Sequence, residues 1–162
     1  MKEFVIERVV DAAREDVWKA WTLPERLRQW WGPRGFTVSY CKVKLRQGGT
    51  MHYCLKAPDG TDMWGKFVYQ EIVRPEKLVF ISSFSDEKQG VTRHPMNEGW
   101  PLQMMSTVTF EEQGPDRTKV TVRWSPYVAT EAERKVFDAG HESMRNGWSG
   151  TLDQLAACLA SG

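Results

Sequence analysis

The chain has 162 residues, a length typical of one domain, so we expect a single domain over residues 1–162. Its 22 lysines and arginines nearly balance its 21 aspartates and glutamates, and such a balance disfavours nucleic acid and anionic membranes as partners. No segment approaches the roughly 20 apolar residues of a membrane span, and the charged N-terminus has no apolar signal core, so the sequence predicts a cytoplasmic protein.

The N-terminal part is predicted to be one strand followed by two short helices. Residues 3–10 are rich in β-branched side chains, which favour a strand, and residues 11–22 carry apolar side chains at helical spacing. Thr22 and Glu25 have the spacing of a capping box, which would begin a second helix. Gly32-Pro33 is expected to end that helix.

Trp30 and Trp31 stand side by side at the end of the second helix. Consecutive residues of a helix point about 100° apart, so the two rings cannot face the same surroundings. We expect Trp30 to pack in the core near Trp18 and Trp21, and Trp31 to lie at the mouth of a cavity.

Residues 36–126 have the pattern of consecutive antiparallel strands separated by turns. A polar segment at 85–101 interrupts them, and because loops of this length are commonly functional we consider it a candidate lid. The last part is predicted to be helical, with a capping box at Thr130 and Glu133 and one apolar stripe over residues 131–160, kinked near Gly140. A stripe of this length needs a large curved sheet to cover it, which predicts an α+β fold.

Tryptophan and histidine bear most on function. The chain has eight tryptophans, and large aromatic side chains either fill a core or line an apolar cavity. The three histidines, His52, His94 and His141, have no metal-ligand spacing, and the three cysteines contain no C-x-x-C pair. The sequence therefore predicts reduced thiols, no metal site and no cofactor.

Five segments of the chain, taken in order, resemble one protein family. They are RVVDAAREDVWKAWTLPERLRQWWGP, KVKLRQGG, IVRPEKLVF, TVTFEE and GWSGTLDQLAACLA, and they span about Val5 to Ala160. This set is similar to the activator of heat-shock protein 90 ATPase homologue type of the SRPBCC superfamily, also called START-like or Bet v 1-like. The resemblance implies a helix-grip fold, in which a curved antiparallel sheet of six to seven strands wraps around a long C-terminal helix and encloses a hydrophobic pocket.

The candidate ligand-binding residues are aromatic, methionine and histidine side chains expected on the inner face of this sheet and helix or near the pocket mouth. For the apolar residues the alternative is a fully packed core, and for the histidines it is a surface or structural role. The candidates are Trp31, His52, Trp64, Phe84, His94, Trp100, Met104, Trp124, Met144 and Trp148.

The first functional hypothesis is a cytoplasmic binding protein for a small hydrophobic or aromatic ligand. The second is an enzyme similar to polyketide cyclases and dehydratases, in which His52, His94 or Glu142 acts as general acid or base. The third is an interaction module with a chaperone partner, although the chaperone activation of the eukaryotic namesake also depends on a separate domain. A homodimer is a further expectation, and no catalytic residue is assigned.

Overall fold

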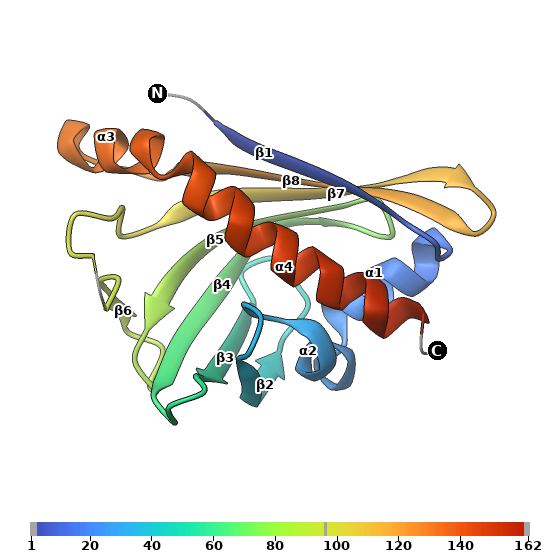
Figure 1. Ribbon diagram of the computed structural model, residues 1–162, viewed down its shortest axis with the longest axis horizontal. Helices are drawn as coiled ribbons and strands as arrows, with labels where there is room; N and C mark the ends of the chain where they lie inside the picture. Colours follow the sequence, from blue (N-terminus) through green and yellow to red (C-terminus); the bar gives the residue numbers. More distant parts are fainter. Residues whose placement is uncertain (1–2, 96, 161–162) are drawn as a thin grey trace.

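A curved antiparallel sheet wraps around the C-terminal helix (Figure 1). This computed structural model describes residues 3–95 and 97–160, and over these residues seven strands follow one another in the order β1-β8-β7-β5-β4-β3-β2, with the short β6 paired to β5. The strands are β1 (Phe4–Val10), β2 (Thr37–Val43), β3 (Thr50–Lys56), β4 (Asp62–Val73), β5 (Lys77–Ser85), β6 (Val91–Thr92), β7 (Met104–Gly114) and β8 (Arg117–Pro126).

The helices lie on one side of this sheet. They are α1 (Arg14–Thr22), α2 (Pro24–Trp30), α3 (Glu131–Ala139) and α4 (His141–Ala160). In Figure 1, α4 crosses the sheet diagonally, and α1 and α2 lie beside its C-terminal half. The predicted α+β fold, with a curved antiparallel sheet around a long C-terminal helix, is confirmed. Among the described residues, no helix is long and apolar enough to cross a membrane.

Side chains of the central strands alternate between the two faces of the sheet. In β7, Ser106, Val108 and Phe110 are buried, whereas the residues between them are only half-buried. Across the ladder, Val108 pairs with Val122 of β8 and Phe110 with Val120, so buried apolar residues stand opposite one another. The sequence pattern predicts this alternation with a period of two. The buried residues form the inner face of the sheet, on which the helices pack.

The junction of α1 and α2 differs from the expectation. Thr22 is the last residue of α1, and its hydroxyl donates to the carbonyl of Trp18 at 2.8 Å. Leu23 precedes α2 without a side-chain cap, so the predicted capping box of Thr22 and Glu25 is wrong. The physical reason is that Thr22 is buried, and the carbonyl one turn back is the acceptor within its reach.

Trp30 lies in the core, as predicted. It is 2% exposed, and its indole N–H donates to the carbonyl of Ala20 at 2.9 Å. Its ring also contacts Trp21, with 4.8 Å between the ring centroids. Trp31 follows the helix in an extended conformation, and its ring stands at 89° to that of Trp30. The two rings touch edge to face, with centroids 5.6 Å apart, and both contact Trp21, so they belong to one aromatic cluster.

The C-terminal helical region is divided at Gly140. The capping box at Thr130 is confirmed, since its hydroxyl accepts from the Glu133 amide at 3.1 Å and the Glu133 carboxylate accepts from the Thr130 amide at 2.9 Å. The single kinked helix expected after it is two helices, α3 and α4. A side chain at Gly140 would come within 3.0 Å of the Trp100 ring, so the glycine lets the loop before β7 approach this junction.

The polar segment 85–101 is partly ordered by strand pairing and by a contact with α3. It contains β6, whose Val91 and Thr92 pair with the end of β5. Arg93 forms an ion pair with Glu133 at the beginning of α3 and donates to the carbonyl of Trp100 at 3.4 Å. The described residues of this segment are thus tied to both the sheet and the helical region, and its role as a lid stays a prediction.

We expect Thr130→Ala to lower the free energy of unfolding by about 1 kcal/mol, because an unpaired amide is left at the start of α3. Urea denaturation measures the change. Ser143→Ala, at an exposed position of α4, is the control and should change stability by less than about 0.5 kcal/mol. Equal effects of the two substitutions would contradict a stabilising role for the cap.

Acid should destabilise the fold partly through Glu133. Hydrogen bonds from the Thr130 amide and from the Arg93 side chain lower the pKa of its carboxyl below the ordinary value of 4.5. A carboxyl whose pKa is lower in the folded state stabilises the fold above its unfolded pKa and loses this contribution as the pH falls through the folded value. We expect Glu133→Gln to weaken the loss of stability on acidification below about pH 4.5. Urea titrations from pH 6 to 3 measure it, and identical slopes in both proteins would refute this role.

Candidate ligand-binding cavity

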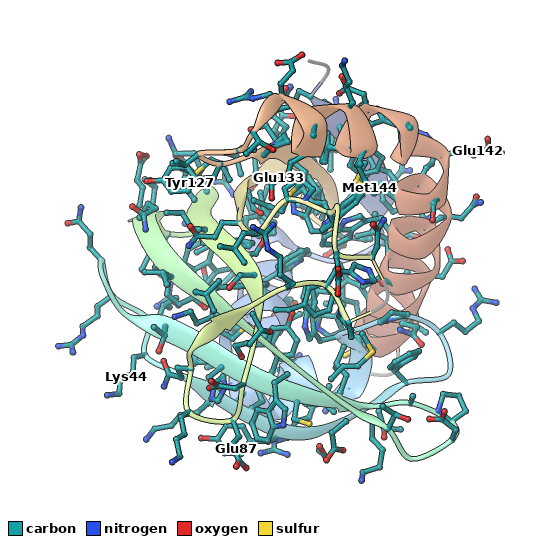
Figure 2. The ribbon with its side chains drawn as sticks, turned by 90° about the vertical axis from the view of Figure 1, so that its left-hand side faces the viewer. Lys44, Glu87, Tyr127, Glu133, Glu142 and Met144 are labelled. Atoms are coloured by element: carbon teal, nitrogen blue, oxygen red, sulfur yellow. The ribbon has the colours of Figure 1, made fainter. Side chains whose placement is uncertain are left out.

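A cavity of about 260 Å³ lies between the inner face of the sheet and α4. Its wall contains Met104 of β7 and Trp124 of β8, and α4 contributes Met144 and Trp148. Figure 2 shows Met144 directed from α4 toward the interior, while Glu142 on the same helix points away into solvent. The wall is largely apolar because the inward positions of these strands are the ones with aromatic and aliphatic side chains.

Trp148 is the centre of the aromatic part of the wall. Its ring centroid is 5.8 Å from that of Trp31 and 5.4 Å from that of Trp124, and both pairs meet edge to face. Trp31 in turn contacts Phe67 of β4 at 5.3 Å. Edge-to-face contacts of this kind hold rigid rings at defined angles, so part of the cavity surface is preorganised.

Tyr53 enters the wall from β3 because its neighbour across the ladder is a glycine. Tyr53 pairs with Gly65 of β4, and a Cβ at Gly65 would lie 2.4 Å from the Tyr53 hydroxyl oxygen. The tyrosine side chain therefore lies over the glycine. Burial raises the pKa of Tyr53 to about 12, so the hydroxyl stays protonated at neutral pH.

The polar atoms of the wall are few and uncharged. The hydroxyls of Ser82 and Ser106 lie 3.3 Å apart and can bond to each other, although only Ser82 belongs to the wall. The Thr151 hydroxyl lies 3.1 Å from the carbonyl oxygens of Gly32 and Gly147, to which it can donate. The indole N–H of Trp124, by contrast, is buried without a hydrogen-bond partner, whereas a side-chain hydrogen bond from Trp31 to Tyr53 partly offsets the rise in the tyrosine pKa.

The cavity opens between the α2–β2 loop and α4. Pro33 and Gly147 both line the cavity and are themselves exposed, which places them at its opening. They also border a shallow surface groove with Arg34 and Asp153, whose side chains form an ion pair at 2.9 Å. Because Gly147 has no side chain and open space around it, α4 does not block the opening at this position.

Most of the candidate binding residues meet at this cavity. The candidates that line it are Trp31, Phe84, Trp100, Met104, Trp124, Met144 and Trp148.

The remaining three candidates lie outside the wall. His52 and Trp64 point to the outer face of the sheet, where their rings stack with 5.0 Å between centroids. The Nε2 atom of His52 is also 3.1 Å from the carbonyl oxygen of Asp86. His94 contacts Phe84 and Trp100 through its ring, at 4.8 and 6.3 Å, and so adjoins two wall residues without lining the cavity.

Sequence reasoning missed the wall residues of β3 and β4. These are Tyr53, Leu55, Met63 and Phe67. The signal was present as a strict alternation, since His52 and Tyr53 must face opposite sides of the same strand. The prediction of His52 as a binding residue assumed that the face of β3 with His52 is the inner face, whereas the inner face is the one with Tyr53.

Two further site predictions concern metals and thiols. The described residues contain no group of three histidine, cysteine or acidic side chains close enough to hold a metal ion. Cys41, Cys54 and Cys158 are buried and form no disulfide among the described residues. Burial raises the pKa of Cys41 to about 11, which keeps this thiol protonated and unreactive at neutral pH.

The curved sheet around a long C-terminal helix is the helix-grip arrangement of START-like, or Bet v 1-like, proteins. Residues 11–160 match the family model described as "Activator of Hsp90 ATPase homolog 1-like protein". The chain belongs to this family, as its sequence motifs predict.

Solved structures show the same fold. A protein from Arthrobacter aurescens is 27% identical, with a TM-score of 0.79 over 99% of this chain and 87% of that one. A protein from Nitrosomonas europaea is 21% identical, with a TM-score of 0.77 over 98% of this chain and 94% of the other. An AHSA1 protein from Silicibacter pomeroyi is 18% identical, with a TM-score of 0.73 over 98% of each chain. A comparison with curated proteins gives no match.

Two glycine substitutions should have opposite effects on stability. Gly65→Ala should lower the free energy of unfolding by about 1–3 kcal/mol, because the new methyl group overlaps the Tyr53 ring. Gly147→Ala should raise it by about 0.5–1 kcal/mol, because this helical glycine has open space around it.

Chemical denaturation of the single variants and of a Tyr53→Leu, Gly65→Ala double variant tests the first effect. The double variant should lose less stability than the sum of its single substitutions, because the overlap is removed. Additive losses would show that Gly65 is not needed for the placement of Tyr53.

Proposed function

We propose that this protein binds a small hydrophobic or aromatic molecule in the cavity between the sheet and α4. The observation that carries the proposal is a partly open, aromatic-lined space of about 260 Å³ with its opening beside Gly147. Burial of apolar ligand surface supplies the affinity, at roughly 25 cal/mol per Å² before the costs of association. As part of the same proposal, the protein acts in the cytoplasm.

The cavity volume limits the size of the ligand. A protein cavity of about 150 Å³ holds benzene, so by proportion about 260 Å³ takes on the order of ten non-hydrogen atoms. This is the size of a two-ring aromatic molecule. The rings of Trp31, Phe67 and Trp148 offer flat faces and edges against which such a molecule can pack.

The acid–base alternative has less support. Of its three candidate groups, His52 lies on the outer face of the sheet, His94 contacts wall residues without lining the cavity, and Glu142 points into solvent. The titratable group of the described wall residues is Tyr53, and its raised pKa of about 12 makes it a poor proton donor or base at neutral pH. The geometry therefore favours binding over proton transfer.

An interaction module for a chaperone would be expected to have a contiguous exposed apolar patch. The exposed large hydrophobic residues of the described chain come from widely separated segments. They are Val9, Leu23, Tyr40, Leu45, Val73, Val91 and Val128. The chaperone partner and the homodimer both stay predictions.

A titration with naphthalene, followed by two-dimensional NMR of the ¹⁵N-labelled protein, tests the proposed function. We expect shifts at Trp31, Met144 and Trp148, with a Kd on the order of 0.1 mM for a ligand of about ten heavy atoms. Trp64, on the outer face of the sheet, should not shift.

Two substitutions at the opening provide matched variants. Gly147→Phe should weaken naphthalene binding at least about 10-fold by filling the opening, whereas Gly147→Ala should leave it within about 2-fold. The proposed function is contradicted if naphthalene shifts no wall resonance, or shifts only residues of the outer face.

A further inference from the structure

The opening of the cavity adjoins a polar groove. Pro33 and Gly147 border both spaces, so a molecule in the cavity can extend directly into the groove. The described residues of the cavity wall include no Asp, Glu, Lys, Arg or His, whereas Arg34 and Asp153 line the groove. Burying an ionised group in apolar surroundings is strongly unfavourable. A charged group of a ligand would therefore lie in the groove, with the apolar part of the ligand in the cavity.

Two arginines share one carboxylate at this groove. Asp153 accepts through Oδ1 from Arg8 at 2.6 Å and through Oδ2 from Arg34 at 2.9 Å. Two positive groups and one negative group leave a formal charge of +1. An anion is attracted by this excess charge, whereas a cation meets a carboxylate that already has a partner on each oxygen. The groove therefore favours an anionic group.

Arg34 is the arginine that can bind a ligand. Its side chain is 72% exposed, and within the described chain its guanidinium donates only to Asp153. A guanidinium has five N–H donors, so others remain for a second partner. The Arg8 side chain is only 27% exposed and also lies 3.3 Å from the Ser149 hydroxyl. Because Arg8 stays on Asp153, Arg34 can turn toward a ligand without leaving the carboxylate unpaired.

The backbone holds Arg34 beside the opening. The loop between α2 and β2 is attached to α4, because the Gly32 carbonyl accepts from the Gln154 side chain at 2.7 Å and from the Thr151 hydroxyl at 3.1 Å. A side chain at Gly150 of α4 would begin 3.9 Å from the Arg34 Cβ atom, so the helix passes close to the arginine with no side chain between them. The position of Arg34 is thus set, while its long side chain stays in solvent.

We propose that the ligand of this cavity is an amphipathic anion, with an aromatic body of about ten non-hydrogen atoms in the cavity and a carboxylate or similar oxyanion in the groove, bound by Arg34. This inference rests on the proposed binding function and adds the charge and the orientation of the ligand. Burial of the body supplies most of the affinity, because an exposed ion pair contributes little. The charged group determines which end of the ligand stays outside.

Three naphthalenes of nearly equal size test the proposal: the anion 2-naphthylacetate, its neutral amide 2-naphthylacetamide, and the cation 2-(2-naphthyl)ethylammonium. Isothermal titration calorimetry at pH 7.5 with the whole chain gives their dissociation constants. At low salt we expect the anion to bind about 2- to 5-fold more tightly than the amide, and the cation to bind most weakly. The preference for the anion should shrink in about 0.5 M NaCl, because salt screens an exposed ion pair.

Two substitutions in the same ion pair should change this preference in opposite directions. Arg34→Gln should remove most of the preference for the anion over the amide, because the binding cation is lost. Asp153→Asn should increase it about 2- to 5-fold, because the acid that competes for Arg34 is lost. The ratio of the two dissociation constants corrects for a general loss of packing, which weakens both ligands.

Arg74→Gln is the matched control. Arg74 is 63% exposed and forms an ion pair with Glu15, as Arg34 does with Asp153, but neither Arg74 nor Glu15 lines the cavity or the groove. This substitution lowers the net charge by the same amount as Arg34→Gln. The preference for the anion should nevertheless remain that of the unsubstituted protein.

The outcomes separate the two proposals. If the amide or the cation binds as tightly as the anion, the inferred ligand class is wrong while the binding function stands. The same conclusion holds if Arg34→Gln leaves the preference unchanged, if the two substitutions of the ion pair change it in the same direction, or if only naphthalene itself binds. If neither naphthalene nor any of the three compounds binds, the proposed function is wrong, and the inferred ligand class falls with it.

Discussion

The contact among the indole rings of Trp21, Trp31 and Trp148 is the constraint on which the arrangement of the interior depends. Their centroids lie 5.8 to 6.3 Å apart, and each ring comes from a different segment: α1, the residue after α2, and α4. Trp21 and Trp31 extend the contact to the sheet through Phe110 and Phe67. Because indole rings are rigid and large, they set how closely α4 can approach the sheet, and space remains on one side of them as the cavity.

Charged side chains lie outside this aromatic interior. Ion pairs are placed at the margins of the molecule, for example between Arg34 and Asp153 beside the opening and between Arg93 and Glu133 at the start of α3. Wall positions are occupied by aromatic, aliphatic and hydroxyl side chains instead. A space of this kind can select a ligand by size and polarity, but it has few groups that could move a proton or stabilise a developing charge.

Two glycines near the cavity make room for aromatic side chains of its wall. Gly65 makes room for the Tyr53 ring across the β3–β4 ladder, and Gly140 lets Trp100 reach the α3–α4 junction. Trp100 also lines the cavity, and Arg93 of the same segment forms an ion pair with Glu133 of α3. Glycines in this protein thus place aromatic side chains, in addition to forming turns.

The sequence by itself determined the order of the main helices and strands, the Thr130 capping box and the burial of Trp30, because these depend on local spacing and on hydrophobic periodicity. Its ordered motifs determined the family by resemblance. Only the tertiary structure decided which face of each strand is the inner one. In β3, Tyr53 lies in the cavity wall and its chain neighbour His52 lies on the outer face. Strand alternation requires the two side chains to point to opposite faces, but it does not specify which face is the inner one. The division of the last helical region at Gly140 and the contacts of Trp31 and Trp124 with Trp148 likewise depend on side chains that meet from distant segments, and the local sequence does not specify those contacts.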